Sequence, residues 1–285
     1  MAQANKKKPG AGFALTTMQF VFSKLGPIFP DFFAMRAYNM WFTTHRFNAP
    51  AIEQQYMKKA ACSTINITGI DVAVYSWGEG KPVLFIHGWS GRGTQVAPYV
   101  DLLVNNGYRV ISYDAPAHGK TPGKQTSILQ VYDVIHALDE IYDGFHASIT
   151  HSFGGMLLAY AMQYGFRTDK AVCICPPANI DSILDNFQRT LAIPDRVIER
   201  MKQRLFTMYG LGLKQRISTT ENVRSIDIPA LIIHDKNDED IDWHDGEAVA
   251  EAWPGAEFVL TQGLGHRRVL RDENTINRAI NFIKR

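Results

Sequence analysis

The stretch Ile149-Thr150-His151-Ser152-Phe153-Gly154-Gly155 joins a short apolar strand, residues 147–150, to an apolar helix over residues 153–164. A serine on so sharp a turn projects its hydroxyl from the edge of the sheet. The next N–H, from Phe153, lies at a helix start, where the helix dipole favours negative charge. Thr150 departs from the G-x-S-x-G pattern, which has a glycine there. The alternative to a catalytic role is a purely structural one, in which Ser152 caps the helix and the two glycines let the helix pack closely.

Strand and helix patterns alternate on both sides of this turn. Residues 82–86 form a continuous apolar run, which is typical of a strand buried on both faces. The pattern predicts further strands at 64–76, 109–113, 171–175, 231–234 and 257–261, and helices at 96–106, 127–142, 244–253 and 274–283. This order predicts an α/β fold with a mostly parallel central sheet flanked by helices.

The alternation lapses after residue 177 and resumes near residue 226. Two helices are predicted in between, over 180–191 and 194–209, and we interpret them as an inserted helical cap. The second helix carries an apolar stripe, which we expect to dock onto the sheet domain and in part to line an apolar pocket: Val197, Ile198, Met201, Leu205 and Met208. The predicted organisation is a leader (1–60), a first core part (61–177), a cap (178–225) and a second core part (226–285).

The composition is that of an ordinary soluble globular protein. The chain has 285 residues, 46% hydrophobic and 20% charged, and a net charge of +2, which argues against disorder, coiled coils and nucleic-acid binding. Cys62, Cys173 and Cys175 are too few for a disulfide framework and lack a second pair at zinc-ligand spacing. No metal is expected, and a reducing, cytoplasmic location fits best. In a strand, Cys173 and Cys175 would share one face.

The leader, residues 1–60, differs in kind from the rest of the chain. It holds eight Lys and Arg against two acidic residues, and many of the aromatic residues. Residues 1–11 are expected to be disordered, and two or three short helices should follow. Its interrupted apolar runs predict neither a cleaved signal nor a spanning helix. Residues 12–47 could dock on an anionic membrane surface, but packing on the core or a second subunit is favoured.

Three more loops follow predicted buried strands, so they should open at the same carboxyl edge as Ser152. The glycine-rich turn at 85–91 could present N–H groups to an oxyanion. An acidic loop lacks the central glycine and twelfth-position Glu of a calcium loop, and several of its carboxylates compete to orient a histidine: Asp235, Asp238, Glu239, Asp240 and Asp242. The last loop presents His266 between flexible glycines. The order Ser, Asp, His across three strand ends indicates a nucleophilic triad.

From residue 64 onward, the chain resembles serine hydrolases of the α/β-hydrolase fold, esterase- or lipase-like, with a small helical cap. The matching motifs are His87-Gly88-Trp89, 114–119, 150–154, 234–238 and Gly265-His266. The resemblance implies Ser152 as nucleophile, His266 as general base and Asp238 as the acid. It also implies the backbone N–H groups of Trp89 and Phe153 as oxyanion donors. Asp235, where the family usually has glycine, is the alternative acid.

The resemblance implies hydrolysis of a carboxylic ester through an acyl-enzyme, without a cofactor. The apolar cap stripe favours a hydrophobic acyl group. His87, Gly88 and His151 are expected beside the substrate, the histidines chiefly as packing and hydrogen-bonding residues. C–C or amide hydrolysis, perhydrolysis on the same triad, or a non-catalytic binding protein of this fold are the alternatives. The expected partner is a small-molecule ester and not a nucleic acid, and a homo-oligomer stays open.

Overall fold

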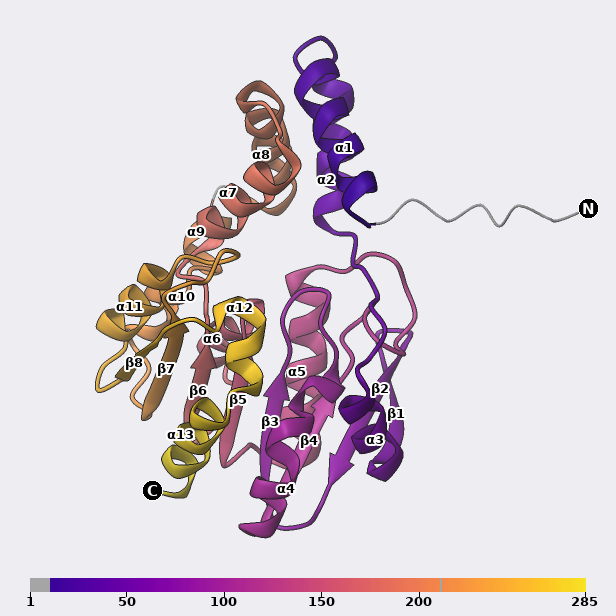
Figure 1. The fold of residues 1–285 in the computed structure, drawn as a ribbon. Coiled ribbons are helices and arrows are strands. Elements are labelled where there is room, and N and C mark those ends of the chain that lie inside the picture. Colours follow the sequence, from indigo (N-terminus) through magenta and orange to yellow (C-terminus); the bar gives the residue numbers. More distant parts are fainter. Residues whose placement is uncertain (1–10, 211) are drawn as a thin grey trace, which may run out of the picture. The chain divides into compact units, whose positions relative to one another are not determined.

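The computed structural model describes residues 11–210 and 212–285 (Figure 1). The disorder expected for residues 1–11 therefore falls outside the described residues, apart from Ala11. The chain divides into two compact units, which we call unit 1 (1–41 and 184–213) and unit 2 (42–183 and 214–285). These limits differ from the predicted ones, because residues 42–60 group with the sheet and the rest of the leader groups with the inserted helices.

An eight-stranded sheet forms the centre of unit 2, in the order β1-β2-β4-β3-β5-β6-β7-β8. Its strands are β1 (Ala61–Ile67), β2 (Ile70–Trp77), β3 (Lys81–Ile86), β4 (Tyr108–Tyr113), β5 (Ala147–His151), β6 (Ala171–Ile174), β7 (Ala230–Asp235) and β8 (Glu257–Thr261). The β1–β2 and β2–β4 pairs are antiparallel, and all other neighbours are parallel. The predicted fold class, a mostly parallel sheet flanked by helices, is confirmed.

The single strand expected over 64–76 is a hairpin of β1 and β2. Thr68 and Gly69 both have positive φ, 49° and 83°, as a two-residue type I′ turn requires. The apolar residues fall on odd positions before the turn (Ile65, Ile67) and on even positions after it (Ile70, Val72, Val74), so the alternation changes phase at the turn. The single-strand prediction overlooked this shift. Ile67 pairs directly with Ile70 across this turn.

Helices cover both faces of the sheet, as Figure 1 shows. The apolar run of β3 is split between two buried clusters, with Val83 and Phe85 in one and Leu84 and Ile86 in the other. Residues of α3 (Ala51–Lys59), α4 (Ala97–Asn105) and α13 (Glu273–Lys284) join the first cluster. Residues of α5 (Ile128–Tyr142), α6 (Phe153–Gln163), α10 (Thr219–Val223) and α11 (Trp243–Ala252) join the second. The short elements are η1 (Gly93–Val96), α9 (Leu213–Arg216), α12 (Gly265–Arg268) and η2 (Val269–Arg271).

A buried ion pair explains why α3 belongs with unit 2. The Glu53 carboxylate is buried and accepts hydrogen bonds from Arg92 Nε at 2.5 Å and Arg92 Nη2 at 3.1 Å. The Thr94 hydroxyl donates to the same carboxylate at 2.9 Å. Because an unpaired buried carboxylate is strongly destabilising, these bonds fix α3 beside η1.

Unit 1 contains α1 (Ala11–Leu25), α2 (Pro30–Trp41), most of α7 (Ile180–Leu191) and α8 (Asp195–Tyr209). Four stripe residues of α8 are buried, whereas Met208 is exposed. Helix α2 packs against α8 and buries Phe33, Ala34 and Ala37. Asp31 of α2 forms an ion pair with Arg200 of α8. The apolar stripe thus has a partner in the leader, which amphipathicity alone could not identify.

Candidate active site

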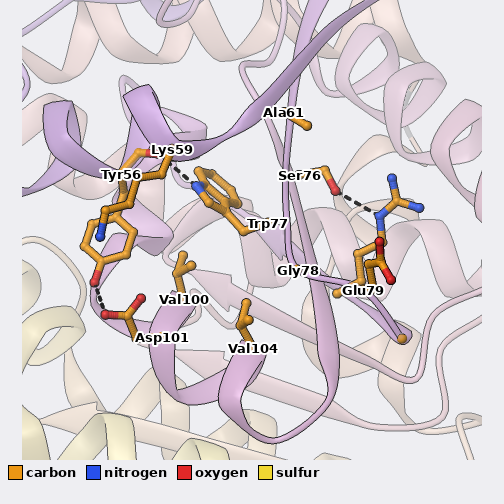
Figure 2. A pocket seen from close by; sticks show the side chains of 12 residues that line it. Tyr56, Lys59, Ala61, Ser76, Trp77, Gly78, Glu79, Val100, Asp101 and Val104 are labelled. Carbon is orange, nitrogen blue, oxygen red and sulfur yellow. Dashed lines mark hydrogen bonds between the residues drawn. The ribbon is translucent and has the colours of Figure 1, made fainter.

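One cavity of about 690 Å³ lies at the amino ends of β3 and β4 and contains none of the expected site residues (Figure 2). Trp77, Val100 and Val104 form its apolar part. Its polar groups already pair with one another: Tyr56 donates to Asp101 at 2.5 Å, and Arg109 to the Ser76 hydroxyl at 2.9 Å. This arrangement offers no nucleophile and base pair, so the chemistry must be sought at the carboxyl edge.

Ser152 occupies a strained turn between β5 and α6. Its φ of 55° and ψ of −125° lie where L-residues are rare, a strain of about 1–3 kcal/mol that marks functional sites. A Cβ on Gly154 would lie 2.3 Å from the Ile86 carbonyl oxygen, and one on Gly155 would lie 2.9 Å from Pro176 Cβ. Both glycines are therefore needed for α6 to approach the sheet.

Thr150 fits this turn although the pattern has glycine at its position. Its side chain is fully buried, and its hydroxyl lies 3.5 Å from the Val172 carbonyl of the neighbouring strand. A Cβ on Gly155 would be 3.4 Å from the same hydroxyl. The β-branched side chain is accommodated because Gly155 leaves space beside it.

The two residues expected to supply oxyanion donors, Trp89 and Phe153, are neighbours at the Ser152 turn. The two rings meet edge to face with centroids 5.5 Å apart, so the two loops are neighbours. Within the described ranges, neither N–H has a hydrogen-bond partner. A Cβ on Gly88 would lie only 3.0 Å from Ser152 Cβ, so this close approach depends on glycine. Such a pair of free donors can stabilise an oxyanion beside Ser152.

Asp238 and His266 form a close pair. His266 Nδ1 lies 2.6 Å from Asp238 Oδ2, and the Asp238 side chain is fully buried. The nitrogen beside the carboxylate must carry the proton, which leaves Nε2 as a base. Burial by itself raises the pKa of Asp238, but hydrogen bonds from His234 and His266 outweigh it and hold that pKa well below the usual range.

His151 connects this pair with the Ser152 turn. Its Nε2 donates to the His266 carbonyl oxygen at 2.8 Å, and the two rings are 4.8 Å apart. In the described part of the chain, no hydrogen bond joins the Ser152 hydroxyl to His266 or to another group. Catalytic hydrogen bonds between a nucleophile and its base often form only once substrate binds.

Asp235, the alternative acid, binds the backbone just ahead of His266. Its buried carboxylate accepts N–H bonds from Leu264 at 3.1 Å and Gly265 at 2.8 Å, and a hydroxyl bond from Thr261 at 2.8 Å. Burial raises the pKa of Asp235, but these bonds outweigh it and lower that pKa. A glycine at position 235 would have no side chain to accept these hydrogen bonds. The aspartate that replaces the family's usual glycine therefore holds the loop before His266 in place.

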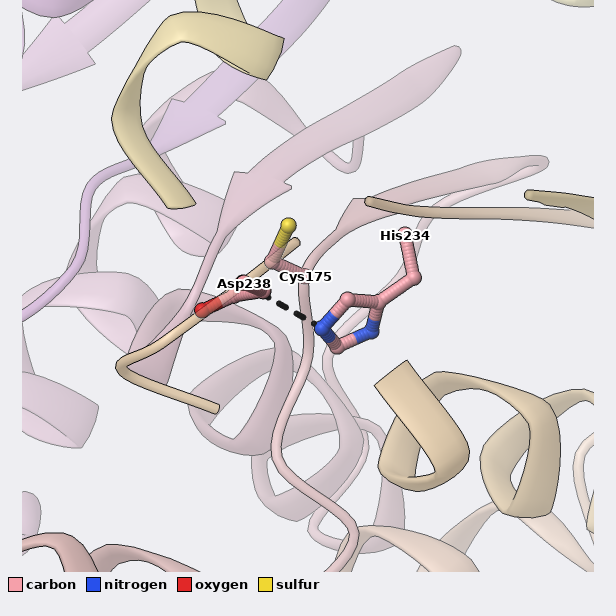
Figure 3. Close-up of side chains that lie close together, drawn as sticks. All are labelled: Cys175, His234 and Asp238. Atoms are coloured by element: carbon pink, nitrogen blue, oxygen red, sulfur yellow. Dashed lines mark ion pairs between the residues drawn. The ribbon is translucent and has the colours of Figure 1, made fainter. Parts of the chain in front are cut away.

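His234 and Cys175 surround the other side of Asp238 (Figure 3). His234 Nε2 lies 3.3 Å from Asp238 Oδ2 and 3.2 Å from the Ile241 carbonyl, so that nitrogen carries the proton. Burial raises the pKa of the Cys175 thiol well above its usual value, and the thiol bonds the Asp238 carboxylate. These donor types suit zinc, but each is engaged with Asp238, so we assign them to positioning that carboxylate.

The prediction that the two cysteines of this segment share one face is wrong. Cys173 belongs to the cluster of Leu84, and Cys175 to the cluster of Phe85. Cys175 has a φ of 50°, just beyond the end of β6. This turn takes its side chain out of the strand alternation.

His87 and His118 support the glycine-rich loop. Both are buried. His87 Nε2 accepts the Ala115 N–H at 3.1 Å while its Nδ1 donates to the Gly88 carbonyl at 2.8 Å. His118 Nε2 accepts the Ser90 N–H at 2.9 Å. Both rings are occupied by backbone groups, which favours their packing role over substrate contact.

The same loop is held by Asp114. Its buried carboxylate accepts from the Gly93 N–H at 2.8 Å, the Tyr75 hydroxyl at 2.6 Å and the Lys120 N–H at 2.7 Å. A Cβ on Gly119 would lie 2.2 Å from this carboxylate. The motif at 114–119 thus stabilises the loop that carries Trp89.

We expect acid to destabilise the protein through His118 and His151. Burial lowers the pKa of each to about 3 from the 6.5 of an unperturbed histidine. The unfolded chain therefore binds more protons between these values, and stability is lost as pH falls below about 6.5. Each histidine contributes a slope of up to about 1.4 kcal/mol per pH unit.

Urea unfolding from pH 7 to pH 4 measures this slope. A His151→Asn variant should show a shallower slope than the wild type, while the half-exposed His136→Gln control should not. An unfolding free energy that stays constant from pH 7 to pH 4 would contradict the assignment.

Comparison with known proteins shows which family the chain belongs to. A model described as "Alpha/beta hydrolase family" matches residues 83–278. The non-heme chloroperoxidase CPO-A1 of Kitasatospora aureofaciens is 24% identical over 70% of this chain and 89% of that protein. The bifunctional esterase/perhydrolase DCH of Acinetobacter calcoaceticus is 20% identical over 74% and 94%, respectively.

Solved structures agree on the fold. A bromoperoxidase from Bacillus anthracis superposes with a TM-score of 0.61 at 24% identity, covering 79% of this chain and all of that one. A putative lipase from Acinetobacter baumannii gives a TM-score of 0.63 at 17% identity, over 84% and 97%. Among the described residues, no helix has the length and hydropathy to cross a bilayer. Because the family model spans more than half of the sequence, this chain belongs to the alpha/beta hydrolase family.

Proposed function

We propose that this protein is a serine hydrolase that cleaves carboxylic esters. The observation that carries the proposal is the Asp238–His266 pair at 2.6 Å, on the sheet edge where Ser152 occupies a strained turn. Ser152 is the nucleophile, His266 the general base, and Asp238 the residue that fixes the tautomer of His266. No step requires a metal or a cofactor.

The proposed reaction runs through an acyl-enzyme. Ser152 Oγ attacks the ester carbonyl while His266 Nε2 takes its proton, and the N–H groups of Trp89 and Phe153 stabilise the oxyanion. The tetrahedral intermediate collapses, and the leaving alcohol takes the proton back from His266. Water then attacks the acyl-enzyme, again with His266 as base, and releases the carboxylic acid and free Ser152.

We further propose a preference for hydrophobic acyl groups. The apolar stripe of α8 packs against α2. The half-buried rings of Trp89 and Phe153 beside Ser152 support this preference. A series of p-nitrophenyl esters from acetate to laurate tests both parts. We expect kcat/KM to rise with acyl length, and Trp89→Ala to flatten the rise. A folded enzyme inactive on every ester would contradict the proposal and favour a binding protein.

Perhydrolysis is the second candidate, favoured by the names of the relatives. Several are non-heme haloperoxidases, and one is an esterase/perhydrolase. Hydrogen peroxide would replace water in the attack on the acyl-enzyme, releasing a peroxycarboxylic acid and free Ser152. The rate of peracid formation from acetate and hydrogen peroxide is compared with the rate of ester hydrolysis by the same preparation. The ratio of the two rates shows how much of the activity is perhydrolysis.

We expect Asp235→Gly to lower kcat by roughly 10–100-fold with little change in KM, because the His266 loop loses its anchor. Asp235→Asn keeps one acceptor oxygen and should recover part of this loss. Asp240→Asn, half-exposed on the same loop, serves as the control. Steady-state kinetics on p-nitrophenyl butyrate, with circular dichroism to verify folding, make the comparison. An unchanged kcat in a folded Asp235→Gly variant would show that the anchor does not position His266.

A further inference from the structure

The helical hairpin of α1 and α2 exposes a set of large apolar side chains. Six of them define what we call the hairpin surface: Phe13, Phe20, Ile28, Phe29, Phe32 and Met35. Five of the six are more than half exposed, from 56% for Phe32 to 66% for Phe13. Four of the six lie within eight residues, from Ile28 to Met35, and large exposed apolar patches mark interaction sites on soluble proteins.

The hairpin surface is distinct from the faces that pack inside unit 1. Phe13 and Phe20 are seven residues apart and share a face of α1 with Lys24. Phe29 directly precedes α2 and lies at helical spacing from Phe32, and the Arg36 guanidinium lies 5.3 Å from the Phe32 ring centre.

Internal packing uses other residues of the same helices. The Phe22 and Phe33 rings meet at 5.4 Å and are buried, and Phe33 lies on the α2 face that also buries Ala34 and Ala37. The hairpin therefore holds its shape without burying the hairpin surface.

The charge of unit 1 favours an anionic occupant. Its sequence holds ten Lys and Arg against four Asp and Glu, a net +6, whereas unit 2 holds 20 against 24, a net −4. The one acidic residue of the hairpin, Asp31, is neutralised by its ion pair with Arg200. Lys24 and Arg36 thus flank the apolar rings without an adjacent unpaired carboxylate in the hairpin.

We propose that the hairpin surface docks on an anionic membrane surface. Phenylalanine rings flanked by Lys and Arg are the composition of helices that lie in the lipid interface, with rings at the acyl boundary and cations at the headgroup phosphates. The long basic side chains can reach the phosphates while their methylene stems cover apolar surface. The docking would bring the hydrolase to a lipid surface independently of its catalytic residues.

Vesicle co-sedimentation of the full chain tests this proposal. We expect binding to vesicles of phosphatidylcholine with phosphatidylglycerol, and much weaker binding to phosphatidylcholine alone. Phe20→Ser/Phe29→Ser/Phe32→Ser should weaken the binding by at least roughly tenfold, from the apolar area lost. Lys24→Gln/Arg36→Gln should weaken it by roughly fivefold per charge and reduce its salt sensitivity.

The matched control is Leu129→Ser/Ile141→Ser, which removes two exposed apolar side chains from α5 in unit 2. It should bind as the wild type does, and all variants should keep their turnover of a soluble short-chain ester. Failure of the wild type to bind anionic vesicles, or equal losses in the control, would overturn the proposal. So would a concentration-dependent dimer that the triple variant dissociates, since a second copy would then occupy the surface.

Discussion

Ser152→Ala is expected to lower kcat for ester hydrolysis by roughly 10⁵–10⁶-fold, the size of effect that loss of a serine nucleophile has in a triad. The alanine keeps the shape of the turn but leaves no oxygen to attack the carbonyl. KM should change little, because the proposed oxyanion donors are the backbone N–H groups of Trp89 and Phe153, which the substitution leaves in place. Steady-state kinetics on p-nitrophenyl butyrate give the measurement.

The stability of the Ser152→Ala variant adds an independent check. Ser152 has a φ of 55°, a strain that alanine would share, so the unfolding free energy should fall by no more than about 1 kcal/mol. Ser63→Ala, on the exposed strand β1, is the control and should retain full activity. Residual activity within tenfold of the wild type would exclude Ser152 as the nucleophile.

Asp238→Asn is expected to lower kcat by roughly 10⁴-fold, as the same change does in other serine triads. The buried carboxylate now accepts from His266 Nδ1, from His234 and from two backbone N–H groups. An amide nitrogen directed at His266 would hold the wrong tautomer, with the proton on Nε2, so the imidazole could not act as a base.

A comparison with Asp235 distinguishes the two acids near His266. If Asp238 fixes the imidazole, then Asp238→Asn should be far more damaging to kcat than Asp235→Asn. The structure places the Asp235 carboxylate on the backbone of Leu264 and Gly265, so its loss should act through loop position. The reverse order of effects would give the acid role to Asp235.

The parts of the fold that follow from local pattern were predictable from the sequence. The strand β3 and the helix α5 are set by patterns within single elements, and the structure has both close to the predicted residues 82–86 and 127–142. The convergence of the loops that carry Ser152, Asp238 and His266 was predictable because parallel strands deliver their following loops to one edge. The hairpin of β1 and β2 was missed, although the alternation shifts from odd to even positions between Ile67 and Ile70 and so marks the turn.

Features that depend on contacts between distant segments were beyond sequence reasoning. The packing of α2 on α8 joins residues more than 150 positions apart, and neither amphipathic pattern names its partner. The anchoring role of Asp235 was hidden because an acid near a histidine suggests the triad acid first. The sequence held one clue: Asp235 and Asp238 lie in the same predicted loop, and a triad needs only one of the two carboxylates. His234 has a similar supporting role that only its burial beside Asp238 shows.

Labelling with a fluorophosphonate probe, followed by intact-protein mass spectrometry, tests the central claim most directly. The wild type should gain one adduct, mapped to Ser152, whereas folded Ser152→Ala and His266→Ala variants should gain none at the same time points. A folded wild type that stays unlabelled, or a Ser152→Ala variant labelled as fast as the wild type, would contradict the proposed nucleophile.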